Sequence, residues 1–142
     1  MRDEYEPELT HLDQLLSPGQ VFIDVGANVG VFSMKAATIV GKKGVVIAVE
    51  PFPEMVTAIW RNMVLNGYDQ VRIRQGVVSN ELGEKTFWMN QGKPNSFSLD
   101  RSDESSSAFS VLSMRIDDLV EWERLEQLHY LKIDAEGAEL LV

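Results

Sequence analysis

The chain has 142 residues, a length that fits one compact domain and leaves no room for separate cofactor and substrate domains. Hydrophobic residues make up 44% of the sequence and charged residues 25%, so a sizeable core is expected and wholesale disorder is not. The formal net charge of −9, with no local basic patch, predicts that neither nucleic acid nor an anionic membrane is a partner.

Cysteine is absent and only two histidines are present, which argues against disulfides, cysteine nucleophiles and a multi-histidine metal centre. We therefore predict no metal site. No apolar run approaches the roughly 20 residues that a membrane span needs. The acidic N-terminal segment lacks the basic-then-apolar layout of a signal peptide. These features predict a cytoplasmic protein.

Helix and strand patterns alternate along the first half of the chain. The expected elements are a helical lead-in within residues 1–20, strands at Val21–Val25, Gly44–Val49 and Val71–Val78, and helices at Val29–Val40 and Pro53–Asn66. The three strands are rich in apolar residues, as in sheets that are buried on both faces. This β-α-β-α-β order predicts a doubly wound α/β domain with a mostly parallel, Rossmann-like sheet, and we treat 1–142 as that single domain.

The second half departs from the alternation. A polar loop is expected at 91–108, where Ser, Asn and Asp are frequent. Further strands are expected at Lys85–Met89, Phe109–Ile116 and Tyr130–Asp134, and a helix at Asp117–Leu125. Asp118 and Glu121 have capping-box spacing at the start of that helix.

The segment Asp24–Gly30 is the strongest indication of a site, because a buried strand there runs into a glycine turn and at once into a helix. Glycine permits close backbone approach to a ligand, and a helix N-terminus presents unpaired N–H groups. Glu50 ends the next strand about 20 residues later, where nucleoside-binding α/β units place the carboxylate that accepts ribose hydroxyls.

The loop differs from the dinucleotide fingerprint G-x-G-x-x-G, because its spacing is G-x-N-x-G and Val31 stands where the last glycine would be. Asp24 would repel a pyrophosphate, whereas it favours a cation. S-adenosylmethionine, with its sulfonium, ammonium and ribose, fits this acidic strand end better. A tight structural turn and another nucleotide binder, such as an NAD-dependent oxidoreductase, remain as alternatives.

A second acidic cluster follows the last expected strand, where Asp134, Glu136 and Glu139 stand close together. Ligands of open α/β sheets bind outside the carboxyl ends of the strands, so Asp134 is expected beside the glycine loop. Lys132 lies two residues earlier and needs a partner, for which an acid at the strand end is the natural candidate. Glu136 and Glu139 also suit a helix N-terminus for purely structural reasons.

These residues resemble the FkbM-type family of class I S-adenosylmethionine-dependent methyltransferases. The resemblance rests on five segments: Val21–Gly30, Val49–Pro51, Arg61–Asn62 with Asn66, Met114–Leu119 and Leu131–Glu139. It implies a methyl transfer from S-adenosylmethionine, often to a hydroxyl on a sugar, polyketide or other natural product.

The resemblance also assigns roles to individual residues. Asp24, Gly26, Asn28 and Gly30 would hold the methionine part of the cofactor, Glu50 would accept the ribose hydroxyls, and Val78 and Ser79 would flank the adenine. Ala27 and Pro51, which lie in the same motifs, are counted with the cofactor-binding residues. Asp134 and then Glu136 are the candidates for the base that removes a proton from the acceptor.

The family's domain continues past the last of these motifs, whereas this sequence stops there. We therefore expect a sheet truncated after its fourth core strand, whose open edge is covered by a missing segment or by a second copy of the chain. A non-catalytic S-adenosylmethionine-binding fragment is the alternative to an active enzyme.

Overall fold

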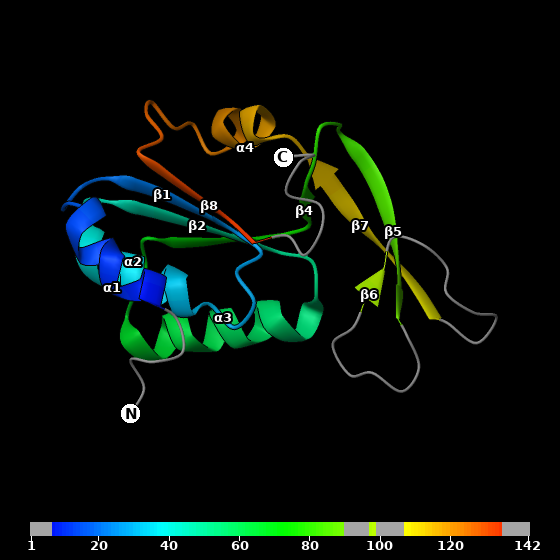
Figure 1. The fold of residues 1–142 in the computed structure, drawn as a ribbon, viewed down its shortest axis with the longest axis horizontal. Helices are drawn as coiled ribbons and strands as arrows, with labels where there is room; N and C mark the ends of the chain where they lie inside the picture. Colours follow the sequence, from blue (N-terminus) through cyan, green and yellow to red (C-terminus); the bar gives the residue numbers. More distant parts are fainter. Residues whose placement is uncertain (1–6, 90–96, 99–106, 135–142) are drawn as a thin grey trace.

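The fold is built from two sheets, a main parallel sheet and a smaller second sheet (Figure 1). The computed structural model describes residues 7–89, 97–98 and 107–134. In chain order the elements are α1 (Pro7–Leu15), β1 (Val21–Val25), α2 (Val31–Val40), β2 (Val45–Glu50), α3 (Pro53–Asn66), β3 (Val71–Gln75), β4 (Val77–Val78), β5 (Gly83–Met89), β6 (Phe97–Ser98), β7 (Ser107–Met114), α4 (Ile116–Trp122) and β8 (Tyr130–Ile133). No helix within these ranges is long and apolar enough to cross a membrane.

The main sheet has the strand order β3-β2-β1-β8, and all of its pairings are parallel. In register, Val25 at the end of β1 lies between Val49 of β2 and Ile133 of β8. The carboxyl ends of three neighbouring strands therefore meet at one edge. This arrangement confirms the predicted α/β class with a mostly parallel sheet.

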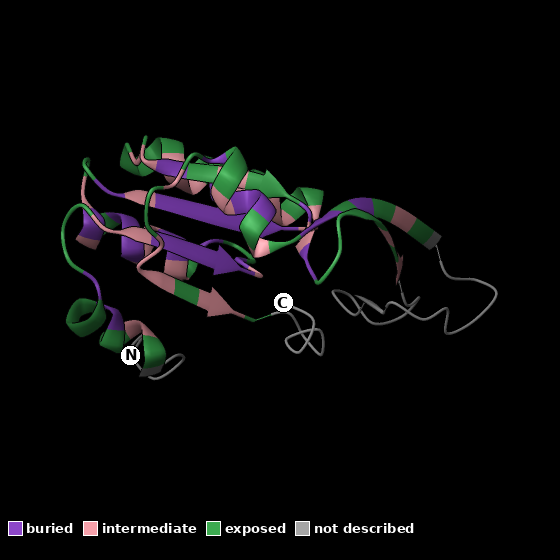
Figure 2. Cartoon of the chain, turned by 90° about the horizontal axis from the view of Figure 1, so that it is seen from above, coloured by how far each residue is buried: buried purple, intermediate pink, exposed green. Residues whose placement is uncertain are grey.

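Side chains alternate between the two faces of this sheet, as the two-residue period of a strand requires. Phe22 and Val46 pack in a cluster with α1 and α2, whereas Ile23 and Ile47 pack in a cluster with Leu119 of α4. Figure 1 shows α1, α2 and α3 on one side of the sheet and α4 on the other. The two central strands, β1 and β2, are almost wholly buried (Figure 2), which explains their nearly continuous apolar sequence.

The second sheet has the order β4-β7-β5-β6 and stands beyond the carboxyl ends of the main strands (Figures 1 and 2). The single strand expected at Val71–Val78 is wrong, because the chain leaves the main sheet at Gly76 and joins β7. A Cβ on Gly76 would lie 2.6 Å from the carbonyl oxygen of Leu112 and 2.7 Å from Cε of Met114. Only glycine lets the two backbones approach this closely at the crossing.

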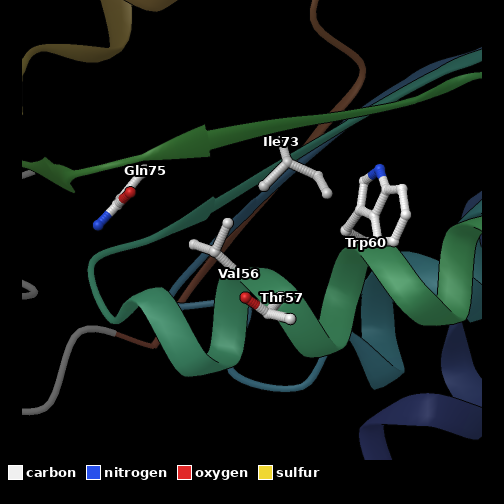
Figure 3. Close-up of a pocket in the computed structure, with 5 residues that line it drawn as sticks. All are labelled: Val56, Thr57, Trp60, Ile73 and Gln75. Carbon is white, nitrogen blue, oxygen red and sulfur yellow. The ribbon is translucent and has the colours of Figure 1, made fainter.

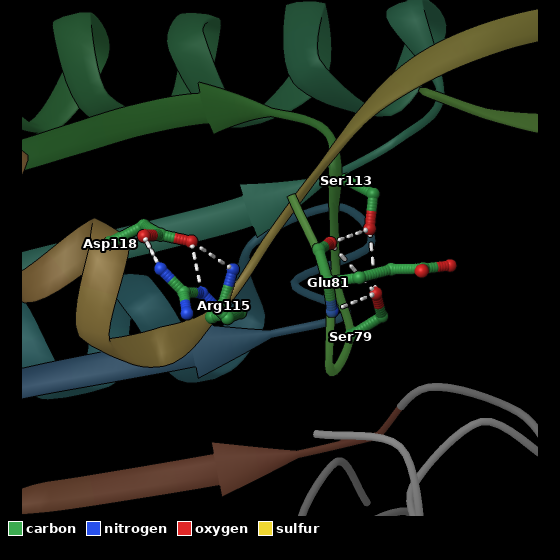
Figure 4. Close-up of polar contacts among 5 residues, drawn as sticks. All are labelled: Ser79, Glu81, Ser113, Arg115 and Asp118. Carbon is green, nitrogen blue, oxygen red and sulfur yellow. Dashed lines mark hydrogen bonds and ion pairs between the residues drawn. The ribbon is translucent and has the colours of Figure 1, made fainter. Parts of the chain in front are cut away.

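Helix α4 begins differently from the expected capping box. Arg115 precedes the helix, and its backbone N–H and its Nε donate to one carboxylate oxygen of Asp118 at 3.0 and 2.9 Å (Figure 4). Nη2 of Arg115 donates to the other oxygen at 2.5 Å. These hydrogen bonds lower the pKa of Asp118 to about 2. Asp118 is therefore the acid that closes the box, and Glu121 is exposed.

Some expectations fall outside the described part of the chain. Within 91–108, where a polar loop is predicted, the structure describes β6 and the first residues of β7. Glu136, Glu139 and the helix expected at the C-terminal end lie outside the described residues. The division of the chain into one domain stays a prediction.

Candidate functional site

Backbone hydrogen bonds fasten the three strand ends to one another at the carboxyl edge of the main sheet. The N–H of Gly26 donates to the carbonyl oxygen of Val49 at 3.0 Å, and the N–H of Asp134 donates to that of Val25 at 3.0 Å. The glycine loop, the end of β2 and the end of β8 are thus brought together, as the sequence predicts for Gly26, Glu50 and Asp134.

The loop after β1 has a left-handed backbone at three positions, with φ values of 74° at Gly26, 53° at Asn28 and 86° at Gly30. A Cβ on Gly30 would also lie 3.1 Å from Cγ1 of Ile59, so this glycine brings α2 close to α3. The side chain of Ala27 is buried in the same small cluster. Asn28 and Val29 are exposed, so these two side chains and the backbone are what the loop presents.

Glu50 lies beside this loop and is only 4% exposed. Its Oε2 accepts the backbone N–H of Asn28 at 2.8 Å, and its Oε1 accepts that of Phe52 at 3.0 Å. The carboxylate is thereby held between the loop and the start of α3. Each carboxylate oxygen has two lone pairs and can accept more than one hydrogen bond, so a carboxylate is a group that suits hydroxyl donors.

Asp24 lies beneath the loop and is completely buried. It accepts a hydrogen bond from Oγ of Ser33 at 2.7 Å and forms an ion pair with Nζ of Lys132 at 3.1 Å. The acid at the end of the lysine's own strand, Asp134, is 3.9 Å from the same ammonium, which also lies 4.7 Å from the ring centroid of Phe32. Lys132 thus forms the expected ion pair with Asp134, but Asp24 is its nearer partner.

These contacts define what the two acids contribute. Asp24 ties β1 to α2 and β8 and fixes the base of the loop, while its direct contact with a ligand stays a prediction. Asp134 keeps 66% of its side chain exposed beside the loop, so it is accessible to a bound molecule.

Val78 and Ser79, predicted to flank an adenine, lie at the junction of the two sheets. Val78 is 3% exposed and packs in the apolar cluster that contains Val25. Oγ of Ser79 and Oγ of Ser113 share a hydrogen bond of 2.6 Å, and they lie 3.2 and 2.9 Å from the carbonyl oxygen of Glu81, which can accept from the hydroxyl that does not donate to the other (Figure 4). Both predicted side chains are therefore occupied within the protein.

An apolar pocket of about 330 Å³ lies outside the predicted site, between α3 and the edge strand β3 (Figure 3). It is lined by Val56, Thr57, Trp60, Ile73 and Gln75. None of the predicted cofactor residues lines this pocket. Its connection to the site is indirect, because Nε2 of Gln75 donates to the carbonyl oxygen of Pro51 at 3.3 Å.

Two residues that sequence reasoning did not single out complete the site. Ser33 bonds the buried Asp24 from the first turn of α2, and Phe52 bonds Glu50 through its backbone. Phe52 could have been found from the sequence, because it follows Glu50 by two residues. Nothing in the local sequence indicates that Ser33 contacts Asp24.

The chemistry of this donor set fits a nucleoside with a cationic group. Two carboxylates, Glu50 and Asp134, and the backbone of a glycine loop meet at one edge, and the only ammonium described there is already paired with Asp24. Hydroxyl donors and a sulfonium suit such carboxylates, whereas a pyrophosphate would be repelled. The described residues contain no group of three or more side chains that could hold a metal ion.

A parallel α/β sheet with a glycine loop and an acidic strand end at its carboxyl edge defines a nucleoside-binding domain. The chain belongs to the FkbM family of methyltransferases, because the family model of the methyltransferase FkbM domain matches residues 24–142. The predicted family is thereby confirmed. No curated protein matches the chain.

Solved structures show partial likenesses. An S-adenosylmethionine-dependent methyltransferase from Aquifex aeolicus is 28% identical with a TM-score of 0.46, and the match covers 54% of this chain and 40% of that protein. An S-adenosylmethionine-dependent O-methyltransferase from Thermotoga maritima is 26% identical with a TM-score of 0.45, and the match covers 49% and 28%. The chain thus spans less than half the length of these proteins.

Proposed function

We propose that this domain binds S-adenosylmethionine and transfers its methyl group to a hydroxyl of a small molecule, such as a sugar or another natural product. The observation that carries the proposal is the buried carboxylate of Glu50, fixed between the N–H groups of Asn28 and Phe52 at the carboxyl edge of the sheet. The family match supports the reaction class.

The residues of the edge divide the work of binding. Glu50 accepts the ribose hydroxyls, and the backbone of the glycine loop, held from below by Asp24, holds the methionine part. When bound, S-adenosylmethionine supplies a methyl group on a sulfonium, which is open to direct displacement. Orientation of the acceptor by the protein then provides much of the rate enhancement.

A hydroxyl acceptor must lose a proton, and Asp134 is the described carboxylate that is exposed beside the loop. A carboxylate within hydrogen-bond reach of the hydroxyl can act as a general base. Glu136 remains the second candidate. The net charge of −9 favours a small-molecule acceptor over nucleic acid.

Calorimetric titration with S-adenosylmethionine, S-adenosylhomocysteine and NAD tests the proposal. We expect both sulfur nucleosides to bind and NAD not to bind. Glu50→Gln should weaken binding about 10–100-fold, since hydrogen bonds to a charged group contribute about 1.5–3 kcal/mol. The matched control is Glu54→Gln, because Glu54 is exposed in the first turn of α3 and its loss should leave the affinity unchanged.

Two outcomes would count against the proposal: no binding of either sulfur nucleoside to the folded protein, or equal weakening by both variants. Asp134→Asn should lower the rate of methyl transfer to a hydroxyl acceptor without changing the affinity for S-adenosylhomocysteine. Binding without transfer to any hydroxyl acceptor would instead favour the alternative, a binding module without catalysis.

A further inference from the structure

Three phenylalanine rings connect the second sheet to the segment that follows Glu50. Phe87 of β5 and Phe109 of β7 are directly opposite each other in the antiparallel ladder, with ring centroids 5.8 Å apart. The ring of Phe52, at the start of α3, lies 5.4 Å from that of Phe109 and 6.3 Å from that of Phe87. The three rings therefore form one cluster that spans both parts of the fold.

Phe52 links this cluster to the candidate site through its backbone. Its N–H donates to Oε1 of Glu50 at 3.0 Å, and its φ of −86° fixes the direction of that N–H relative to its own side chain. A ring held by two neighbours restricts how far this peptide can rotate. The contacts of Phe87 and Phe109 thus act on the orientation of the Glu50 carboxylate without touching it.

A second connection reaches Glu50 from the same direction. The carbonyl oxygen of Glu50 accepts the N–H of Gly76 at 3.1 Å, and Gly76 is the residue at which the chain crosses to β4. The side chain of Glu50 is therefore bonded to Phe52, whose ring contacts the second sheet, and its main chain is bonded to Gly76, which leads into that sheet.

We propose that Phe87 and Phe109 are positioning residues of the nucleoside site, which hold Glu50 through Phe52 so that it selects ligands with ribose hydroxyls. This proposal rests on the proposed function, in which Glu50 accepts those hydroxyls. Because coupling between two parts of a protein is reciprocal, nucleoside binding also stabilises the orientation of the second sheet.

The test compares S-adenosylhomocysteine with its analogue that lacks both ribose hydroxyls, each titrated by calorimetry. The ratio of the two affinities reports on the Glu50 contact alone, because a loss of folded protein affects both ligands equally. The wild-type chain should prefer the natural ribose by at least about 10-fold, the loss expected when a carboxylate loses its hydroxyl partners. In Phe109→Ala and Phe87→Leu the ratio should fall below about 3-fold on the same grounds.

Two further variants separate positioning from general stability. Phe109→Tyr keeps the ring and should restore the wild-type ratio. Leu112→Ala removes an exposed apolar side chain from the opposite face of β7 and should also leave the ratio unchanged.

The outcomes are distinct. An unchanged ratio in folded Phe109→Ala and Phe87→Leu overturns the positioning proposal while leaving the proposed function intact. A wild-type chain that binds S-adenosylhomocysteine without preferring the ribose hydroxyls also overturns it, because Glu50 then has no such role. Failure of the wild-type chain to bind S-adenosylhomocysteine overturns the proposed function itself.

Discussion

Replacing Lys132 by methionine removes the ammonium that neutralises Asp24 and keeps most of the side-chain stem. Asp24 is fully buried, and the Lys132 side chain is 20% exposed. After the change, the buried carboxylate retains only the hydrogen bond from Ser33 among the side-chain contacts described here. A buried charge without its counter-ion is the costly half of a broken ion pair.

The burial of this ion pair sets how much stability Lys132→Met should lose. Removing one partner of a buried pair costs about 3–5 kcal/mol, and the partial exposure of Lys132 favours the lower end, about 3 kcal/mol. For a domain of this size, each kcal/mol lowers the melting temperature by about 3–5 °C, so Lys132→Met should melt about 10 °C below the wild-type chain.

Urea unfolding followed by circular dichroism measures the loss in the free energy of unfolding. A second, exposed ion pair supplies the control. Lys35 lies 2.6 Å from Asp13, but 36% and 55% of these two side chains are exposed. Lys35→Met should therefore cost less than about 1 kcal/mol. If Lys132→Met costs no more than Lys35→Met, the argument from burial is refuted. Recovery of most of the loss on adding Asp24→Asn would support it.

Two further substitutions probe the junction of the sheets. Asp118 has its pKa lowered to about 2 by the hydrogen bonds from Arg115, so its contribution to stability is complete above the unfolded pKa of about 4 and is lost as the pH falls toward 2. The difference in urea midpoint between the wild type and Asp118→Asn should accordingly be constant from about pH 7 to 5 and shrink below about pH 4; a difference that persists at about pH 2 contradicts this. Gly76→Ala should cost at least about 2 kcal/mol more than Gly83→Ala, because both glycines have nearly the same φ (157° and 158°) but only the first Cβ meets the Leu112 carbonyl. Equal unfolding free energies would show that the chain relaxes around the added methyl group.

The main sheet could be predicted from sequence because its signals are local. Short apolar runs predicted β1 and β2, the strands whose carboxyl ends carry the glycine loop and Glu50, and α3 occupies the predicted range Pro53–Asn66. The spacing of the loop and Glu50 then located the candidate site, and the structure brings both to one edge.

The second sheet could not be predicted in the same way, because its pairings depend on distant residues. The apolar pattern continues from Val71 to Val78, and only the approach of β7 to Gly76 shows that the strand is divided there. The ion pair between Lys132 and Asp24 could not be predicted for the same reason, since these residues are adjacent only through the register of β1 with β8. Contacts set by strand register have no signature in either local sequence.

The pairing of β1 with β8 also affects how the chain reaches this structure. Three of the four strands of the main sheet are complete by Gln75, whereas the ammonium that neutralises Asp24 comes from a residue 108 positions further along the chain. Contacts between such distant residues form slowly, because the intervening chain must be ordered first. During synthesis, one edge of β1 stays open and a buried acid stays without its counter-ion until the second sheet and α4 have been made. The order of the strands thus places the assembly of the candidate site after the synthesis of the second sheet and α4.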